Sequence, residues 1–212
     1  MITSVIFDLD GVIVFTDKYH YLAWKMIADE LGIYFDEEIN NRLRGVSRMD
    51  SLNIILENYD GEELSPERKI ELATRKNDYY RELLKKMSPS DVADSVRDTL
   101  YKLKKRDYFI ALGSSSKNAK FILERVNLLD AFDVISDGTN IINSKPNPEV
   151  FVKAANFLSQ PCNHCLVVED AEAGINAGKS AGMATVAIGD ATKGNIADRN
   201  IDDFSDLLDI LL

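Results

Sequence analysis

The sequence predicts an α/β fold built around a mainly parallel sheet, with an all-helical segment inserted after the first strand. Short apolar runs alternate along the chain with longer stretches of helical periodicity, which is the order that a parallel sheet requires. The interval between the first two runs is much longer than one crossover helix needs. A chain of 212 residues with 45% hydrophobic and 28% charged residues can bury a sizeable core, so a disordered or fibrous protein is excluded.

The short apolar runs are predicted to be the strands of the sheet. They cover residues 4–7, 108–112, 133–135, 165–168 and 185–188. In open parallel sheets, ligands bind outside the carboxyl ends of the strands. We therefore expect the functional side chains to lie where these runs end.

The inserted segment is predicted to span residues 16–88 and to form a cap domain. Residues 1–15 and 89–212 then form a discontinuous core domain. The first cap helix is expected to begin at Asp17, a good N-cap residue, and to stop at Gly32.

Three further helices are predicted in the cap. Two of them cover residues 36–43 and 49–58. Ser65 followed by Pro66 has the pattern of an N-cap with proline in the first turn, so a third helix is expected from there to about Met87. The cap is therefore expected to be all-helical.

Composition and charge exclude several classes of partner. The chain has 25 Lys and Arg against 35 Asp and Glu, a net charge of -10, so neither nucleic acid nor an anionic membrane is expected as its partner. Without a signal-like leader or an apolar run of about 20 residues, a cytoplasmic location is expected. No pattern in the sequence indicates an oligomeric state, so a monomer is the default expectation. Cys162 and Cys165 lack a second pair, so they are expected to be plain thiols rather than a zinc or redox site.

Two pairs of carboxylates follow predicted strands. Asp8 and Asp10 come after the first strand, and Glu169 and Asp170 come after the fourth. Either pair alone could be a polar loop that closes a strand. Four acids at one sheet edge repel each other unless a cation is present, and oxygen ligands favour Mg²⁺ over Zn²⁺. An aspartate beside a bound cation can also attack phosphorus as a nucleophile.

Polar residues after the second and third strands are candidates for binding an anion. Ser114 ends the second strand, and Ser116 is expected to cap the next helix. The first amides of that helix, together with Ser114 and Lys117, would form an anion site. Lys145 precedes Pro146, which presents the lysine in an extended loop at the entrance of a helix. An ordinary serine cap and a solvated lysine are the structural alternatives at these positions.

Taken in order, these clusters resemble the four sequence motifs of the haloacid dehalogenase (HAD) superfamily. The matching residues are Asp8-Leu9-Asp10-Gly11, Ser114, Lys145-Pro146 and Glu169-Asp170. The resemblance implies a Rossmann-like parallel-sheet core, with Asp8 as the nucleophile and Asp10 as the general acid and base. It also implies that Ser114 and Lys145 hold the phosphoryl oxygens. One Mg²⁺ would be bound by Asp8, the carbonyl of Asp10 and Asp170, with help from Glu169.

The inserted segment narrows the resemblance to the β-phosphoglucomutase family of this superfamily. The matching stretches are Thr16, Asp17, Tyr19-His20, Ala23-Trp24-Lys25, Arg44-Gly45-Val46-Ser47-Arg48 and Arg75-Lys76-Asn77-Asp78. Members of that family interconvert β-glucose 1-phosphate and glucose 6-phosphate through an aspartyl phosphate and β-glucose 1,6-bisphosphate. The sequence departs from the family at Arg44, where lysine is expected, and at Ala171, where serine is frequent.

By the same resemblance, the loop from Gly45 to Arg48 grips the distal phosphate of the sugar, and His20, Trp24 and Lys76 shape the sugar pocket. The expected substrate-binding residues are Thr16, His20, Trp24, Gly45, Val46, Ser47, Arg48, Lys76, Ser116, Lys117 and Asn118. The expected ligand is a small sugar phosphate, and galactose, mannose or a disaccharide phosphate could replace glucose.

Two other functions share part of this pattern. A HAD-type sugar-phosphate phosphatase would use every core residue, but it has no need of His20 or of a loop for a second phosphate. A phospho-acceptor signalling module also surrounds a phosphorylated aspartate with acids, a hydroxyl group and a lysine. Such a module needs neither a helical cap of this length nor a general acid beside its nucleophile.

Overall fold

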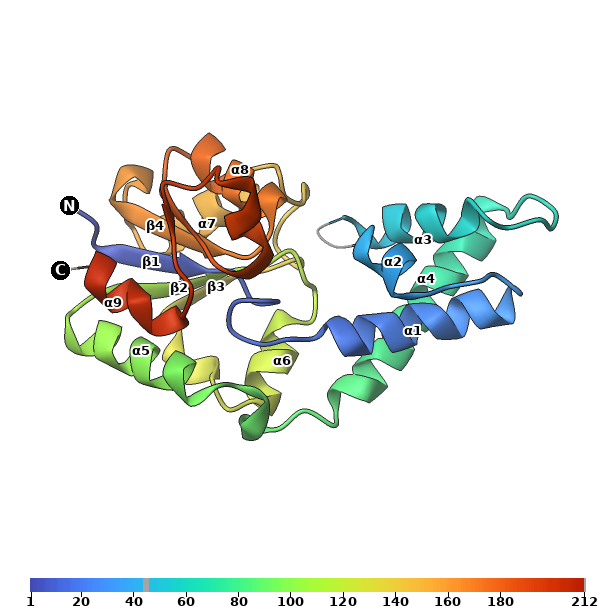
Figure 1. The fold of residues 1–212 in the computed structure, drawn as a ribbon, viewed down its shortest axis with the longest axis horizontal. Coiled ribbons are helices and arrows are strands. Elements are labelled where there is room, and N and C mark those ends of the chain that lie inside the picture. Colours follow the sequence, from blue (N-terminus) through green and yellow to red (C-terminus); the bar gives the residue numbers. More distant parts are fainter. Residues whose placement is uncertain (44–45, 212) are drawn as a thin grey trace. The chain divides into compact units, whose positions relative to one another are not determined.

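A computed structural model describes residues 1–43 and 46–211, and in it the chain divides into two compact units. Unit 1 consists of Met1–Phe15 and Met87–Leu212, and unit 2 consists of Thr16–Lys86. Figure 1 shows unit 1 as a sheet with helices on both faces and the described part of unit 2 as a group of helices. Among the described residues, no helix has the length and apolar character needed to cross a bilayer.

Unit 1 is built on a sheet whose six described strands all run parallel, in the order β3-β2-β1-β4-β5-β6. The strands are β1 (Ser4–Phe7), β2 (Phe109–Gly113), β3 (Val134–Ser136), β4 (Cys165–Glu169), β5 (Ala184–Ala187) and β6 (Arg199–Asn200). The parallel α/β fold that the sequence predicts is therefore confirmed. The short strand β6 was not predicted, because its two residues are exposed and carry no apolar pattern.

Helices cover both faces of this sheet. The helices of unit 1 are α5 (Asp94–Lys105), α6 (Ala119–Arg125), α7 (Glu149–Phe157), α8 (Glu172–Ser180) and α9 (Leu207–Ile210). Helix α7 packs on β1, β2 and β3, and α8 packs beside it on β4 and β5. Helices α5 and α9 contact each other and lie on the other face of the sheet (Figure 1).

Alternation along the strands sends neighbouring side chains to opposite faces. Ile6 of β1 and Val167 of β4 belong to the buried cluster that includes Phe151 of α7. Phe7, the next residue of β1, points the other way and stacks on Phe204, with the ring centres 5.4 Å apart. The residues that continue β1 and β4 on the face of Ile6 and Val167 are therefore directed toward α7.

Unit 2 contains the helices α1 (Asp17–Glu30), α2 (Glu37–Asn41), α3 (Arg48–Leu56) and α4 (Pro66–Leu84) in its described part. Helix α4 packs along α1 and α3. The predicted start of α4 is confirmed, because the Ser65 hydroxyl accepts the Arg68 N–H at 3.2 Å and Pro66 is the first helical residue. Gly32, with a φ of +70°, follows the end of α1 as predicted.

Several predicted helix ends in unit 2 are wrong by a few residues. The helix predicted at 36–43 is α2 (Glu37–Asn41), and the helix predicted at 49–58 is α3 (Arg48–Leu56). Asp17 is the first residue of α1 and Thr16 is the N-cap. A carboxylate is favourable at either position, since both are near the positive end of the helix dipole, so the sequence does not separate them. Helix α4 ends at Leu84 rather than near Met87, because Met87 leaves the helix and is fully buried in unit 1.

The core of unit 2 offers a direct test of its packing. Leu72 of α4 is fully buried in the same cluster as Trp24, the single tryptophan of the chain. We expect Leu72→Ala to lower the free energy of unfolding of unit 2 by about 2–5 kcal/mol, because it removes buried apolar area and leaves a cavity. Urea unfolding followed by Trp24 fluorescence measures this change.

The matched control is Ile70→Ala on the same helix, where the side chain is 59% exposed. We expect this change to stay within about 0.5 kcal/mol of the parent protein. Equal losses in the two variants would contradict the packing described for α4.

Candidate active site

The sheet register brings two acids together at the carboxyl edge of the central strands. Phe7 of β1 pairs with Val168 of β4, and the Asp8 N–H donates to the Val168 carbonyl at 3.0 Å. The next residues along these strands, Asp8 and Glu169, therefore lie side by side. Both are buried, and the alternation of side chains directs them toward α7.

Lys145 bridges these two acids. Its Nζ lies 2.5 Å from Asp8 Oδ1 and 2.5 Å from Glu169 Oε1, and its side chain is only 8% exposed. Burial alone would lower the pKa of Lys145, but the charges of Asp8 and Glu169 outweigh burial and raise it. The lysine is therefore an ammonium ion at any physiological pH.

Asp170 adds a third carboxylate. One oxygen from each of Asp8, Glu169 and Asp170 lies within 4.8 Å of the others. Burial, together with the negative charges of Asp8, Glu169 and Asp10, raises the pKa of Asp170 to about 8. Burial also raises the pKa of Glu169, although the Lys145 ammonium and the Ala171 N–H oppose the shift.

This donor set fits a hard divalent cation. The three carboxylates carry more negative charge than one ammonium group can balance, and a cation would remove the excess. All three donors are carboxylate oxygens, which suits Mg²⁺ better than Zn²⁺.

Two glycines leave the space that the acids occupy. Gly11 has a φ of +80°, and a Cβ there would lie 1.9 Å from Asp170 Oδ2. A Cβ at Gly174 of α8 would lie 1.9 Å from Glu169 Oε1. Only a residue without a Cβ leaves room for each of these carboxylates, so the backbone packs directly against them and restricts their positions.

Asp10 lies at the border of this cluster. It is partly exposed and forms an isolated β-bridge with Val14. Its negative charge contributes to the raised pKa of Asp170. Among the described residues, the group of acids with oxygens within 4.8 Å of one another contains Asp8, Glu169 and Asp170 but no Asp10 carboxylate.

The serine segment after β2 differs in part from the prediction. Ser114 is buried at the end of the strand, and its hydroxyl accepts the Ser116 N–H at 3.2 Å. Ser116 does not cap the next helix: its hydroxyl accepts the Asn118 N–H at 3.2 Å, and Asn118 is the N-cap of α6. A serine hydroxyl that bonds two residues ahead forms its own turn and so delays the helix. Asn118 is buried and Lys117 is exposed.

In unit 2, His20 and Trp24 of α1 meet Lys76 and Tyr80 of α4. Lys76 is buried, its Nζ lies 2.8 Å from His20 Nδ1, and it is 4.8 Å from the ring centres of both Trp24 and Tyr80. Burial lowers the pKa of His20 well below its usual value, and the charges of Lys76 and Arg48 lower it further. His20 is therefore neutral and accepts a hydrogen bond from the Lys76 ammonium.

Sequence reasoning missed Tyr80, whose ring stacks on His20 with the centres 4.1 Å apart. Its position four residues after Lys76 on one helix is the signal that could have identified it.

The predicted phosphate loop is described only in part. Gly45 lies outside the described residues, as does Arg44, and Val46 is exposed. Ser47 is the N-cap of α3, and Arg48 is its first residue. The Arg48 guanidinium donates to the side-chain oxygen of Asn77 at 2.8 Å.

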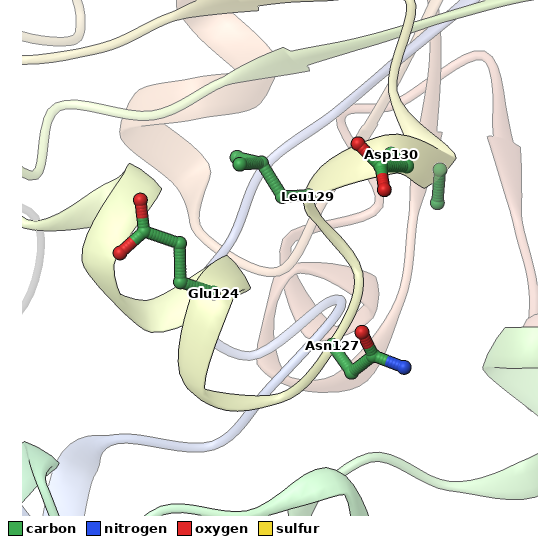
Figure 2. Close-up of a pocket in the computed structure, with 5 residues that line it drawn as sticks. Glu124, Asn127, Leu129 and Asp130 are labelled. Atoms are coloured by element: carbon green, nitrogen blue, oxygen red, sulfur yellow. The ribbon is translucent and has the colours of Figure 1, made fainter.

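Two other features lie outside this group of residues. Cys162 begins a short 3₁₀ helix and Cys165 is the first residue of β4, and both are free thiols. Burial raises the pKa of Cys165 to about 11, so its thiol is protonated and unreactive at neutral pH. A pocket of about 390 Å³ lies between the end of α6 and the start of β3 (Figure 2), and its lining residues are Glu124, Asn127, Leu129, Asp130 and Ala131. None of these residues belongs to the predicted site.

A parallel sheet with an aspartate after β1, a lysine before α7 and an acidic pair at the end of β4 defines a class of phosphoryl-transfer proteins. Residues 2–182 match the model of the haloacid dehalogenase-like hydrolase family, and the chain belongs to this family. The resemblance to the HAD superfamily that the sequence motifs indicate is therefore confirmed.

Within this family, the chain is similar to particular proteins. The chain is 45% identical to a β-phosphoglucomutase of Bacillus subtilis over 188 residues, which cover 88% of this chain and 83% of that protein. A crystal structure of a β-phosphoglucomutase from Clostridium difficile superposes with a TM-score of 0.90 at 39% identity, covering 98% of this chain and 93% of that one. A phosphorylated carbohydrates phosphatase of Thermotoga maritima is 29% identical over 185 residues, 86% of this chain and 83% of that protein.

The close approach of Gly11 to Asp170 predicts how metal affinity responds to one methyl group. In Gly11→Ala the new Cβ would collide with the Asp170 carboxylate, so that carboxylate must move out of the cluster. We expect Mg²⁺ affinity, measured by isothermal titration calorimetry, to fall about tenfold or more, since one of three charged ligands is displaced.

Gly182→Ala is the matched control. Its φ of +72° imposes the same backbone strain, but nothing lies within 4 Å of the added Cβ. This variant should lose about 1 kcal/mol of stability and keep its Mg²⁺ affinity. Unchanged affinity in Gly11→Ala would argue against Asp170 as a metal ligand.

The raised pKa of Asp170 predicts the pH dependence of metal binding. At pH 7 a carboxyl with a pKa of about 8 is mostly protonated, so Mg²⁺ must displace its proton. We expect Mg²⁺ affinity to rise by close to tenfold per pH unit from about pH 6 to about pH 8 and then to level off. Calorimetry in buffers with different ionisation enthalpies measures the released proton.

The stability of the metal-free protein changes with pH in the opposite direction to the Mg²⁺ affinity. The folded pKa of about 8 lies above the value of about 3.9 in an unfolded chain, so the contribution of Asp170 to the stability of the metal-free protein falls as the pH rises between these values. Asp98→Asn, at an exposed position of α5, should leave both dependences unchanged. Mg²⁺ affinity that does not change with pH would contradict the prediction.

Proposed function

We propose that the protein is a β-phosphoglucomutase. It would interconvert β-D-glucose 1-phosphate and D-glucose 6-phosphate through an aspartyl-phosphate enzyme and β-glucose 1,6-bisphosphate. The observation that carries the proposal is the 45% identity to the Bacillus subtilis β-phosphoglucomutase over 88% of the chain. An alignment of this extent includes residues of both units.

Asp8 is the proposed nucleophile. One of its carboxylate oxygens forms a bond to phosphorus while the bond between phosphorus and the sugar oxygen breaks. Phosphoryl transfer mainly requires alignment and charge neutralisation, and Lys145 already holds its ammonium 2.5 Å from the Asp8 carboxylate. Ser114, buried at the end of the neighbouring strand, is the proposed second donor to the phosphoryl oxygens.

Asp10 is the proposed general acid and base. It gives a proton to the departing sugar oxygen in one half reaction and takes one from the attacking hydroxyl group in the other. Its partial exposure supports this role, because a general acid and base must reach the substrate oxygen.

One Mg²⁺ ion is the proposed cofactor, held by Asp8, the carbonyl of Asp10 and Asp170, with Glu169 in support. The three carboxylates within 4.8 Å support this assignment, and the resemblance to β-phosphoglucomutases implies the same ion. When bound, the ion supplies positive charge to the oxygens of the transferring phosphoryl group.

Unit 2 is the proposed cap domain, and it carries most of the side chains proposed to bind the sugar and its second phosphate. A bisphosphate intermediate needs a group for its second phosphate, and the guanidinium of Arg48, with Gly45, Val46 and Ser47, is assigned to it. Lys76, in contact with the neutral His20 and with Trp24, is assigned to the sugar, as is Thr16. Ser116, Lys117 and Asn118 are the proposed contributions of unit 1. A monomer and a cytoplasmic location remain predictions.

A sugar-phosphate phosphatase is the second candidate. The 29% identity to the Thermotoga maritima phosphorylated carbohydrates phosphatase favours it, since the two functions share the core residues. Only the fate of the phosphoryl group separates them: a mutase returns it to sugar, and a phosphatase releases it to water.

The test supplies β-glucose 1-phosphate, a trace of β-glucose 1,6-bisphosphate and Mg²⁺, and measures glucose 6-phosphate beside inorganic phosphate. We expect glucose 6-phosphate as the main product. Inorganic phosphate as the main product would favour the phosphatase.

Asp8→Asn is the control for covalent chemistry. An amide oxygen is a poor nucleophile, so we expect this variant to lose turnover and also acid-stable, hydroxylamine-sensitive labelling by a small phosphoryl donor such as acetyl phosphate. Turnover retained in this variant would exclude an aspartyl phosphate.

A further inference from the structure

Lys145 differs from the acids around it in how its backbone is held. Asp8 and Glu169 directly follow or end strands of the sheet, whose hydrogen bonds fix their positions. Lys145 lies in the segment between β3 and α7, well beyond the end of β3 at Ser136. Another part of the chain must therefore fix the backbone of Lys145.

Glu149, the first residue of α7, holds this segment through hydrogen bonds to its carboxylate. Its Oε1 accepts the Ile142 N–H at 3.0 Å. Its Oε2 accepts the Asn143 N–H at 2.8 Å and the Asn143 side-chain amide at 3.1 Å. Both carboxylate oxygens thus hold backbone that lies two and three residues before Lys145.

Lys153, one turn along α7, completes this attachment. Its ammonium forms an ion pair with Glu149 Oε1 at 2.8 Å and also donates to the Asn140 carbonyl. The Lys153 ammonium lowers the pKa of Glu149 to about 2, and the N–H groups of Asn143 and Ile142 contribute. Glu149 therefore keeps its charge across the working pH range.

The same helix also supports the Lys145 side chain. The Lys145 ammonium lies 4.7 Å from the ring centre of Phe151, which is fully buried. Phe151 cannot shift toward β2, because it packs so closely on Gly113 that a Cβ there would lie 2.6 Å from the ring. Helix α7 thus holds both the segment that carries Lys145 and the ring on which its ammonium rests.

We propose that Glu149 is a positioning residue for Lys145: its carboxylate ties residues 142 and 143 to the first turn of α7 and so fixes the backbone from which Lys145 reaches Asp8 and Glu169. This inference rests on the proposed function, in which Lys145 holds the transferring phosphoryl group. A flexible lysine must be held within about 0.5 Å to act there, and a misplacement of about 1 Å costs on the order of 100-fold in rate.

A purely structural role is the alternative. A glutamate in the first turn stabilises a helix through the dipole and through loop amides, whatever Lys145 does. The two roles differ in one respect. A positioning residue loses its effect on the rate once Lys145 is removed, whereas a structural residue does not.

The experiment is a double-mutant cycle on the full chain. Glu149→Gln removes one of the two charged acceptor oxygens, and it is made alone and together with Lys145→Ala. The rate of Asp8 labelling by acetyl phosphate in the presence of Mg²⁺ is measured under single-turnover conditions. Mg²⁺ affinity and the thermal midpoint are measured for every variant.

We expect Glu149→Gln to slow labelling by about 10- to 100-fold in the parent protein and by less than about twofold in the Lys145→Ala background, with Mg²⁺ affinity unchanged. Glu82→Gln is the matched control, since it makes the same change in the exposed ion pair of Glu82 with Lys85 at the end of α4 and should leave the labelling rate unchanged. Lys153→Gln, which keeps the Glu149 carboxylate, should give a smaller loss that also disappears in the Lys145→Ala background. This second variant decides the case if Glu149→Gln does not fold.

Each contrary result has a distinct meaning. Equal slowing by Glu149→Gln in both backgrounds, or no slowing in the parent protein, would overturn the positioning role while the proposed function stands. A Lys145→Ala variant that labels at the parent rate would instead refute the role of Lys145 in the proposed function, and the positioning role with it.

Discussion

The site depends on one ammonium group held between two buried carboxylates. A parallel sheet brings the ends of β1 and β4 together, and the residues found there, Asp8 and Glu169, repel each other in a buried position. The Lys145 ammonium reduces this repulsion by pairing with both carboxylates. Its single positive charge does not also balance Asp170, so burial and the neighbouring negative charges raise the pKa of Asp170. The need for a divalent cation follows from that imbalance.

The two units handle charge in opposite ways. In unit 1 the acids outnumber the cation that joins them, while in unit 2 a buried ammonium, Lys76, contacts a neutral imidazole and two aromatic rings. His20 can play this part only because burial and nearby cations keep it unprotonated. Although the protein has a net charge of -10, it places buried ammonium groups at Lys145 and Lys76, and such groups attract a phosphorylated ligand.

The sequence predicted the parts of this arrangement that depend on local pattern. Apolar runs located the first five strands to within one residue at each end, and the strand-end rule identified Asp8 and Glu169. Contacts between side chains and separate loop segments could not be predicted from the sequence. No local sequence pattern indicates that Glu149 binds the amides of residues 142 and 143, or that Phe151 supports Lys145. Ser116 was misjudged because a serine hydroxyl can cap a helix or form a turn of its own, and both patterns look alike in sequence.

The insertion of unit 2 directly after β1 sets an order for synthesis on the ribosome. Strand β1 is made first, yet its partners β2 and β4 follow only after the whole helical unit has been translated. Unit 2 is continuous in sequence and its contacts are comparatively local, so it can fold while β1 still has no strand to pair with. Asp8, the proposed nucleophile, therefore follows a strand that is synthesised before unit 2 but can pair with β2 and β4 only after unit 2 has been translated.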